Sequence, residues 1–225
     1  MASGDKKALI DAIDRAANSL RRASRWSGSG RIVSIRDARN YVFEFYCYLR
    51  IVRALRQAYE MEYVPGSGDT ANCFPRNPAG KRGRPKYNVR SRNGARAVLW
   101  QLCAGTQVRD VHNGRRAPDV SLQTAAASDD PLPTDVAIIW DAKYRGNHNA
   151  AISDADFSRF ARLIILLGLG SRPIPRLRLG PLDQLAAHAL LTNGEFSNEP
   201  DAELTRAGFK EARRFFPGKN FDTRP

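Results

Sequence analysis

The sequence predicts an α/β protein, and three observations lead to this prediction. Two long helical patterns come first, three strand candidates follow between residues 97 and 144, and another helical pattern comes directly after the most hydrophobic strand. Helices before and after a group of strands are typical of a sheet covered by helices. We expect an N-terminal helical extension over residues 1–30 and one domain over residues 31–225.

Both N-terminal helices are predicted from apolar residues at helical spacing. The first extends from about Asp5 to Ser24, with Leu9 and Ile13 on its apolar face, and the stretch Ser27–Gly30 ends it. The second extends from about Asp37 to Tyr59 and is more hydrophobic than a surface helix. We therefore expect the second helix to pack against the core.

The three strand candidates are Ala97–Leu102, Asp119–Leu122 and Val136–Tyr144. The run Val136–Trp140 is apolar on both faces, which is typical of a central, covered strand. Ser153 stands three residues before Asp156 and predicts the start of the following helix.

The remaining segments carry weaker patterns. Glycine and proline residues between Gly66 and Pro85 predict a turn-rich region with a short hairpin. In the C-terminal part, we expect partly helical structure over Leu182–Leu191 and Asp201–Phe216 and an irregular tail over Pro217–Pro225.

Composition limits the function classes. The 225 residues include 36 Lys and Arg against 23 Asp and Glu, so the net charge is +13. No apolar run approaches the roughly 18 to 20 residues that cross a bilayer, and the charged first 20 residues do not resemble a signal peptide. The three cysteines are far apart and predict neither disulfides nor a zinc site. We expect a cytoplasmic protein with no membrane association.

The positive charge is concentrated between Phe74 and Arg96, a stretch with eight basic residues and no acid. Such a stretch attracts polyphosphates, which predicts nucleic acid as the partner; a merely solvated loop is the alternative. The four residues expected to contact nucleic acid here are Lys81, Arg82, Arg84 and Lys86. Lys81–Lys86 resembles an AT-hook, which lies in a narrow minor groove, and a hairpin tip that contacts phosphates is the alternative.

Acids and a lysine meet at the end of the most hydrophobic strand. Asp141 and Lys143 point to the same face because side chains alternate along a strand, roughly 6 to 7 Å apart. Asp119 begins a short strand, and if the two strands pair, two carboxylates converge. A divalent cation can neutralise such a pair, and magnesium suits an oxygen-only site. A metal there and an adjacent ammonium suit phosphodiester hydrolysis.

Glu44 is a third candidate acid. It is the only carboxylate between Ala38 and Tyr59 and stands among aromatic and apolar residues, so it needs a cation, a metal or water if it is buried. Asp135 is the fallback for Asp119. The alternative interpretation of the pattern is a surface ion pair between Asp141 and Lys143, with Asp119 in a turn.

Pro118-Asp119, the apolar strand and Asp141-Ala142-Lys143 together resemble the motif of the PD-(D/E)xK nuclease superfamily. The resemblance covers about Ala38–Leu167 and implies a restriction-endonuclease-like α/β core, with a mixed central sheet flanked by helices. It implies that Asp119, Asp141 and the Ala142 carbonyl bind Mg²⁺ and that Mn²⁺ can substitute. It also implies that Lys143 positions or activates water, that Glu44 supports the metal or the water, and that Arg145 meets a phosphate.

These observations predict a magnesium-dependent DNA endonuclease acting in prokaryotic restriction or antiphage defence. The expected partners are DNA and either a second copy of the chain or a partner subunit of a defence system. Two alternatives stay open: a catalytically silent DNA-binding subunit, and a nuclease that acts on RNA or branched DNA.

Overall fold

The computed structural model describes residues 2–24, 38–67, 74, 78–93, 97–196 and 208–225. The elements of these residues, in chain order, are α1 (Ala2–Ser24), α2 (Arg39–Ala58), β1 (Glu60–Val64), β2 (Lys86–Arg90), β3 (Val98–Ala104), β4 (Val108–Arg109), β5 (Arg115–Arg116), β6 (Val120–Thr124), η2 (Pro133–Asp135), β7 (Val136–Lys143), α3 (Asp154–Leu166), η3 (Gly180–Leu185), β8 (Ala189–Thr192), β9 (Lys210–Arg213) and β10 (Asp222–Arg224).

Eight of the described strands form one mixed sheet in the order β1-β2-β3-β6-β7-β8-β9-β10. Pairing is antiparallel from β1 through β2, β3 and β6 to β7, parallel between β7 and β8 and between β8 and β9, and antiparallel again between β9 and β10. Helix α3 connects β7 to the parallel strand β8, as a parallel connection requires. The prediction of an α/β protein with a mixed central sheet is confirmed.

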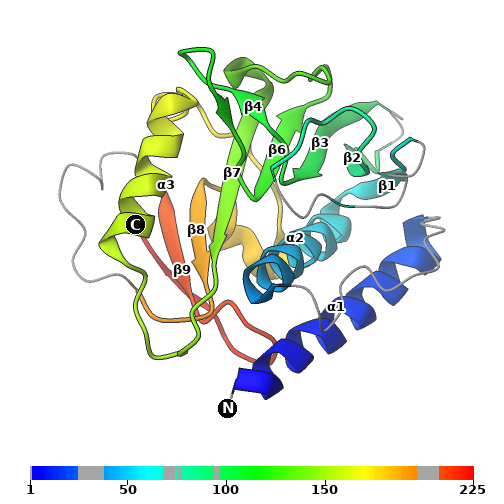
Figure 1. The fold of residues 1–225 in the computed structure, drawn as a ribbon. Helices are drawn as coiled ribbons and strands as arrows, with labels where there is room; N and C mark the ends of the chain where they lie inside the picture. Colours follow the sequence, from blue (N-terminus) through cyan, green and yellow to red (C-terminus); the bar gives the residue numbers. More distant parts are fainter. Residues whose placement is uncertain (1, 25–37, 68–73, 75–77, 94–96, 197–207) are drawn as a thin grey trace.

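The sheet lies between helices, as Figure 1 shows. Helix α2 packs on one face, where Ile138, Trp140 and Leu102 belong to the main core together with Leu9 and Ile13 of α1. Helix α1 lies outside α2. On the other face, α3 forms a second core with β7 and β8. The central strands are therefore covered on both faces, which explains the long apolar run in β7.

Three predicted helices and three predicted strands are confirmed, with ends shifted by one to three residues. Asp37 lies outside the described residues, and Arg39 begins α2. Ser153 caps α3, because its Oγ accepts a hydrogen bond from the Asp156 N–H at 3.2 Å. The turn-rich region connects β1 and β2, which pair with each other as an antiparallel hairpin.

The C-terminal predictions are partly wrong. Leu182–Leu191 covers the last four residues of the short helix η3 and the first three of the strand β8. All four residues of β8 are buried. Residues 201–207 lie outside the described residues, and the remainder of Asp201–Phe216 includes the strand β9 instead of a helix. The tail contains β10, an edge strand joined to β9 by ion pairs of Arg213 with Asp222 and of Arg224 with Glu211.

Among the described residues, no helix is both long enough and apolar enough to cross a membrane.

Candidate active site

The candidate site lies where β6 begins and β7 ends. Pairing between these strands ends at Val120 and Trp140, and β7 continues to Lys143. Beyond the last pair, the Ala142 N–H donates to the Asp119 carboxylate Oδ2 at 2.7 Å. The Asp119 side chain thus accepts the hydrogen bond that a backbone carbonyl of β6 would otherwise accept, and this bond holds Asp119 against the end of β7.

The structure brings all four predicted catalytic side chains together. Asp141 and Lys143 form an ion pair between Oδ2 and Nζ, with the Asp141 side chain 10% and the Lys143 side chain 28% exposed. Asp119 and Glu44 lie close enough to this pair for the charges to influence one another. Three carboxylates therefore share one ammonium group, and they come from three elements or their ends: α2, β6 and β7.

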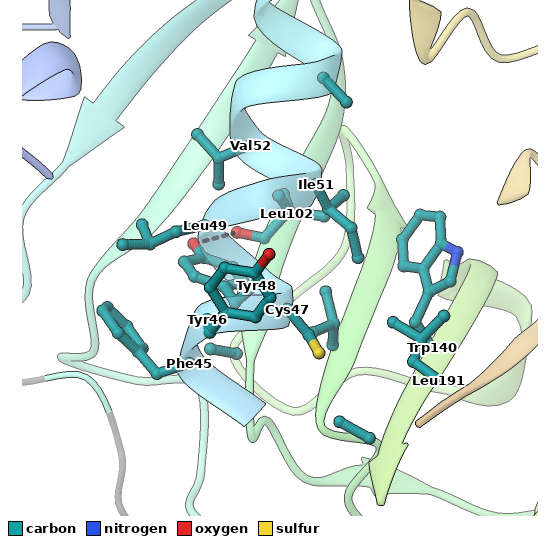
Figure 2. Close-up of a cluster of buried hydrophobic side chains, with 14 of the residues drawn as sticks. Phe45, Tyr46, Cys47, Tyr48, Leu49, Ile51, Val52, Leu102, Trp140 and Leu191 are labelled. Atoms are coloured by element: carbon teal, nitrogen blue, oxygen red, sulfur yellow. Dashed lines mark hydrogen bonds between the residues drawn. The ribbon is translucent and has the colours of Figure 1, made fainter. Parts of the chain in front are cut away.

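Helix α2 brings Glu44 to this position because twelve of its residues are buried in the core. Figure 2 shows Tyr46, Leu49 and Val52 among the buried side chains of α2. The Tyr48 hydroxyl donates to the Leu102 carbonyl of β3 at 3.3 Å. In Figure 1 the N-terminal end of α2 lies beside the end of β7.

Burial sets the protonation of the acids. Burial of the Glu44 side chain raises its pKa to about 7. The charge of Lys143 opposes this rise in part, and the charge of Asp141 adds to it. Burial also raises the pKa of Asp119 well above its usual range, and the neighbouring Asp141 and Glu44 carboxylates raise it further. Burial lowers the pKa of Lys143, but the carboxylates of Asp141 and Asp119 outweigh this and raise it. The lysine is thus a permanent cation among acids that resist ionisation together.

The donor set of the site is made of oxygen atoms. The Ala142 carbonyl lies on the same side of β7 as its N–H, because a strand residue directs both groups to one neighbour, and it therefore faces Asp119. Among the described residues, no group of three or more His, Cys, Asp or Glu side chains is arranged to hold a metal ion. The oxygen atoms of two carboxylates and a backbone carbonyl are the kind of ligands that a hard cation such as Mg²⁺ prefers. In this structure Asp141 instead forms an ion pair with the ammonium group of Lys143.

The loop after β7 is fixed by a residue that the sequence did not reveal. Asn193 accepts a hydrogen bond from the Arg145 N–H at 2.6 Å and donates to the Arg145 carbonyl at 2.8 Å. The Arg145 side chain donates to the Ala151 carbonyl at 2.8 Å and forms an ion pair with Asp156 at 3.4 Å. Asn193 is a polar residue directly after the buried strand β8, and this position is a signal for a functional or structural role. The sequence patterns did not predict β8, so the signal could not be used.

His148 of the same loop contacts the N-terminal helix. Its Nε2 lies 2.7 Å from Asp5 Oδ2 of α1, and its ring packs edge-to-face on Phe216 with 4.8 Å between ring centroids. The loop that follows the site therefore contacts both α1 and the segment between β9 and β10. Asp135, the fallback acid, lies at the other end of β7, where its carboxylate accepts from the Leu132 N–H at 2.9 Å.

The predicted nucleic-acid contacts divide into two kinds. Lys81 is only 3% exposed, and its ammonium donates to the Ala127 carbonyl at 2.8 Å. Burial lowers its pKa. The expectation that Lys81 contacts nucleic acid therefore does not fit its position, because a buried ammonium with a structural partner is not available to a phosphate. Arg82, Arg84 and Lys86 line an open cavity of about 300 Å³ before β2.

Strand β2 begins at the same end of the sheet at which β7 ends. This follows from the registers of Tyr87 with Leu102, Ala104 with Val120, and Val120 with Trp140. Three strand spacings separate β2 from β7, roughly 14 Å in total. Lys86 and the arginines before it are thus on the side of the sheet where the acids meet.

Comparisons with protein-family models, with curated proteins and with solved structures give no significant match to this chain.

Proposed function

We propose that this protein is a magnesium-dependent nuclease that hydrolyses phosphodiester bonds in DNA. The observation that carries the proposal is the convergence of Glu44, Asp119 and Asp141 around Lys143, at the end of β7 that extends beyond its pairing with β6. Three mutually repelling carboxylates destabilise a fold unless a cation joins them, and such arrangements are typical of functional sites. The motif resemblance and the mixed sheet between helices support a restriction-endonuclease-like core.

In this proposal each residue has a role that follows from its position. Asp119, Asp141 and the Ala142 carbonyl would hold Mg²⁺, with Mn²⁺ able to substitute, and Glu44 would support the metal or its water. A bound divalent ion polarises a phosphoryl oxygen and lowers the pKa of water. Lys143 stays protonated, so it would orient the water or stabilise the negative charge that develops on the phosphate.

Arg82, Arg84 and Lys86 would contact the DNA backbone, because they lie at the end of the sheet where the acids meet. Arg145 would meet a phosphate only by leaving Asp156, its present partner.

We propose a prokaryotic, cytoplasmic setting in restriction or antiphage defence, with a homodimer or a partner subunit supplying the second cut.

A DNA-binding subunit without catalysis is the second candidate function. The Asp141–Lys143 ion pair favours it in one respect, because an ammonium already neutralises the carboxylate that a metal would need. A nuclease acting on RNA or branched DNA would use the same four residues.

The test is cleavage of plasmid DNA with Mg²⁺, with Mn²⁺ and with EDTA. We expect cleavage with either metal and none with EDTA. Asp119→Asn, Asp141→Asn and Lys143→Ala should each lower the rate by at least about a hundredfold, since each removes a charged group from the site. Parallel reactions on single-stranded RNA and on a four-way DNA junction identify the preferred substrate.

Asp154→Asn is the matched control, because Asp154 is an exposed acid at the start of α3. It removes one carboxylate charge and should leave the rate unchanged. Equal rates for Asp119→Asn, Asp141→Asn and the wild-type protein would contradict the assignment of the site. DNA binding without cleavage of any of the three substrates would support the binding subunit instead.

A further inference from the structure

A groove lined with arginines runs along α2 on the side away from the candidate active site. One cavity of about 500 Å³ is lined by residues of α2 and η3, by Ser19 of α1 and by Arg92. A second cavity of about 250 Å³ lies between α1, α2 and residues 216–219. Both are lined by Arg50 and Arg53, so they are neighbours along α2. We call this surface the arginine groove; its basic residues are Arg15, Arg50, Arg53, Arg56, Arg92 and Lys219.

The described walls of the arginine groove carry charges of one sign. No described acidic side chain lines either cavity. Elsewhere the described arginines commonly pair with carboxylates, as Arg90 does with Glu62. A concave surface with charges of one sign focuses the potential and attracts a ligand of the opposite sign.

Several guanidinium groups of the groove are held in place by neighbours that carry no charge. Arg50 stacks on the Phe215 ring at 4.0 Å from its centroid and donates to the Tyr46 hydroxyl at 3.4 Å. Arg56 donates to the Ser19 carbonyl at 3.2 Å, and Arg92 donates to the Arg56 carbonyl. Each guanidinium has five N–H donors, so these contacts orient it and leave donors for a ligand. Planar guanidinium groups match the oxygens of a phosphate.

The groove is separate from the site described above. Nine residues separate Glu44 from Arg53, which corresponds to roughly 14 Å along the helix axis and to half a turn around it. Glu44 faces the end of the sheet, and Arg53 faces the groove. A phosphate bound in the groove therefore does not lie at the acids.

The extent of the groove indicates the class of ligand. From Tyr46 to Arg56 it follows α2 for roughly 15 Å, with cations in both cavities. A single phosphate group can contact only part of this length, whereas the backbone of a flexible strand presents phosphates repeatedly. Volumes of about 500 and 250 Å³ suit individual nucleotide units of one strand, so the test below compares a single strand with a duplex. Leu182 and Pro181 give the larger cavity an apolar wall for the bases or sugars.

We propose that the arginine groove binds the phosphate backbone of single-stranded nucleic acid. The basic residues along α2 neutralise successive phosphates, and the strand lies between α1 and η3. Binding there needs no metal and no cleavage, so the inference does not depend on the nuclease function.

The test measures binding of the full chain to a fluorescein-labelled 12-nucleotide single strand and to the matching duplex, in EDTA, at several salt concentrations. Arg15→Ala combined with Arg53→Ala removes two exposed arginines that line the groove. We expect about tenfold weaker binding of the single strand. The slope of log K against log salt should become shallower by about 1.4, since each lost phosphate contact accounts for about 0.7. Duplex binding should stay within twofold of the wild type.

Four controls make the result decisive. Arg162→Ala removes an exposed arginine from α3 and should change neither affinity nor slope. Circular dichroism melting verifies that the double variant is folded, and Arg53→Glu alone should weaken single-strand binding further than Arg53→Ala. Unlabelled ATP, added so that its total phosphate concentration equals that of the labelled strand, should not displace the labelled strand.

Three outcomes would overturn the proposal: unchanged single-strand affinity in the double variant, an equal loss for single strand and duplex, or displacement by ATP, which would indicate a mononucleotide site. Failure of the nuclease proposal would be recognised separately, by cleavage that does not depend on Asp119 and Asp141. The groove variants keep all four of the proposed catalytic residues.

Discussion

Glu44 and Arg53 lie on opposite sides of α2, and their surroundings differ in burial and in the sign of the charge. Glu44 shares a largely buried cluster with two other acids, and one lysine is available to all three. Arg53 is exposed in a groove where cations gather and no described acid lines the wall. Burial makes the like charges of the first region interact strongly, while water screens those of the second.

The difference shows what each region can contribute. In the acidic cluster the protonation states are coupled to the fold, so a change of one residue alters both stability and chemistry. In the arginine groove the charges are solvated, and their neutralisation leaves the fold nearly unaffected while it changes binding. Substitutions that remove one charge from each region test this contrast.

The largest effect is expected for Lys143→Met. At pH 8 this change leaves the carboxylates of Asp141 and Asp119 without their ammonium, and breaking a buried pair in this way is destabilising by about 4 kcal/mol. Urea unfolding measures the change. Lys219→Met removes the same charge from the exposed wall of the groove and should change stability by less than about 0.5 kcal/mol. Equal losses of stability in the two variants would show that the lysine of the acidic cluster is no more important for the fold than an exposed lysine of the groove.

The pH dependence of stability should report Glu44. Its pKa rises from 4.5 to about 7 in the folded protein, so the folded state keeps a proton that the unfolded state has released. Stability should therefore fall as the pH rises from about 4.5 to 7, by on the order of 3 kcal/mol at 1.36 kcal/mol per pKa unit.

Glu44→Gln should remove this part of the decrease when unfolding is followed in urea at each pH without divalent ions. Asp119 retains its own contribution, so the slope becomes smaller without reaching zero. Glu60→Gln, at an exposed position of β1, is the control and should leave the slope unchanged. A Glu44→Gln profile that overlays the wild type would show that Glu44 ionises normally.

An intermediate effect is expected for Lys81, a cation in neither of the two regions. Lys81→Met leaves the Ala127 carbonyl without its donor and should destabilise the fold by about 2 kcal/mol. The neighbouring Arg82 is exposed, and Arg82→Ala should change stability by less than about 0.5 kcal/mol. Thermal unfolding of both variants compares them directly. A larger loss for Arg82→Ala would show that Lys81 is not structural.

The smallest effect on stability is expected for the double variant Arg15→Ala, Arg53→Ala. Both side chains are exposed, so the free energy of unfolding should stay within about 0.5 kcal/mol of the wild type or rise slightly as repulsion between cations is relieved. Urea unfolding of the double variant measures this change. A loss above about 1 kcal/mol would mean that the arginines hold the helices together.

The candidate site was predictable because its signals are local. An apolar run that ends in Asp-x-Lys fixes which two side chains share a face, and alternation along β7 requires nothing from the rest of the fold. Glu44 was found as a lone acid in an apolar helix. Asp119 needed the additional assumption that its strand pairs with β7, which the register confirms.

The missed features depend on tertiary contacts. The run Ala189–Thr192 is buried on both faces, so it lacks the alternation that separates a strand from a helix. Lys81 looked like its exposed neighbours because its acceptor, Ala127, is 46 residues away. Strand β10 ends in charged residues whose partners lie on β9. Sequence patterns carry no information about such distant partners.

The contact between Asp5 and His148 has a consequence for biosynthesis. It joins residues 143 positions apart, so α1 is synthesised long before the histidine that its N-terminal turn contacts. Phe216, which packs on the same histidine, is made later still. Until His148 is synthesised, α1 lacks its contact with the loop after β7. The loop after the acids therefore forms both of these contacts only after Phe216 has been synthesised.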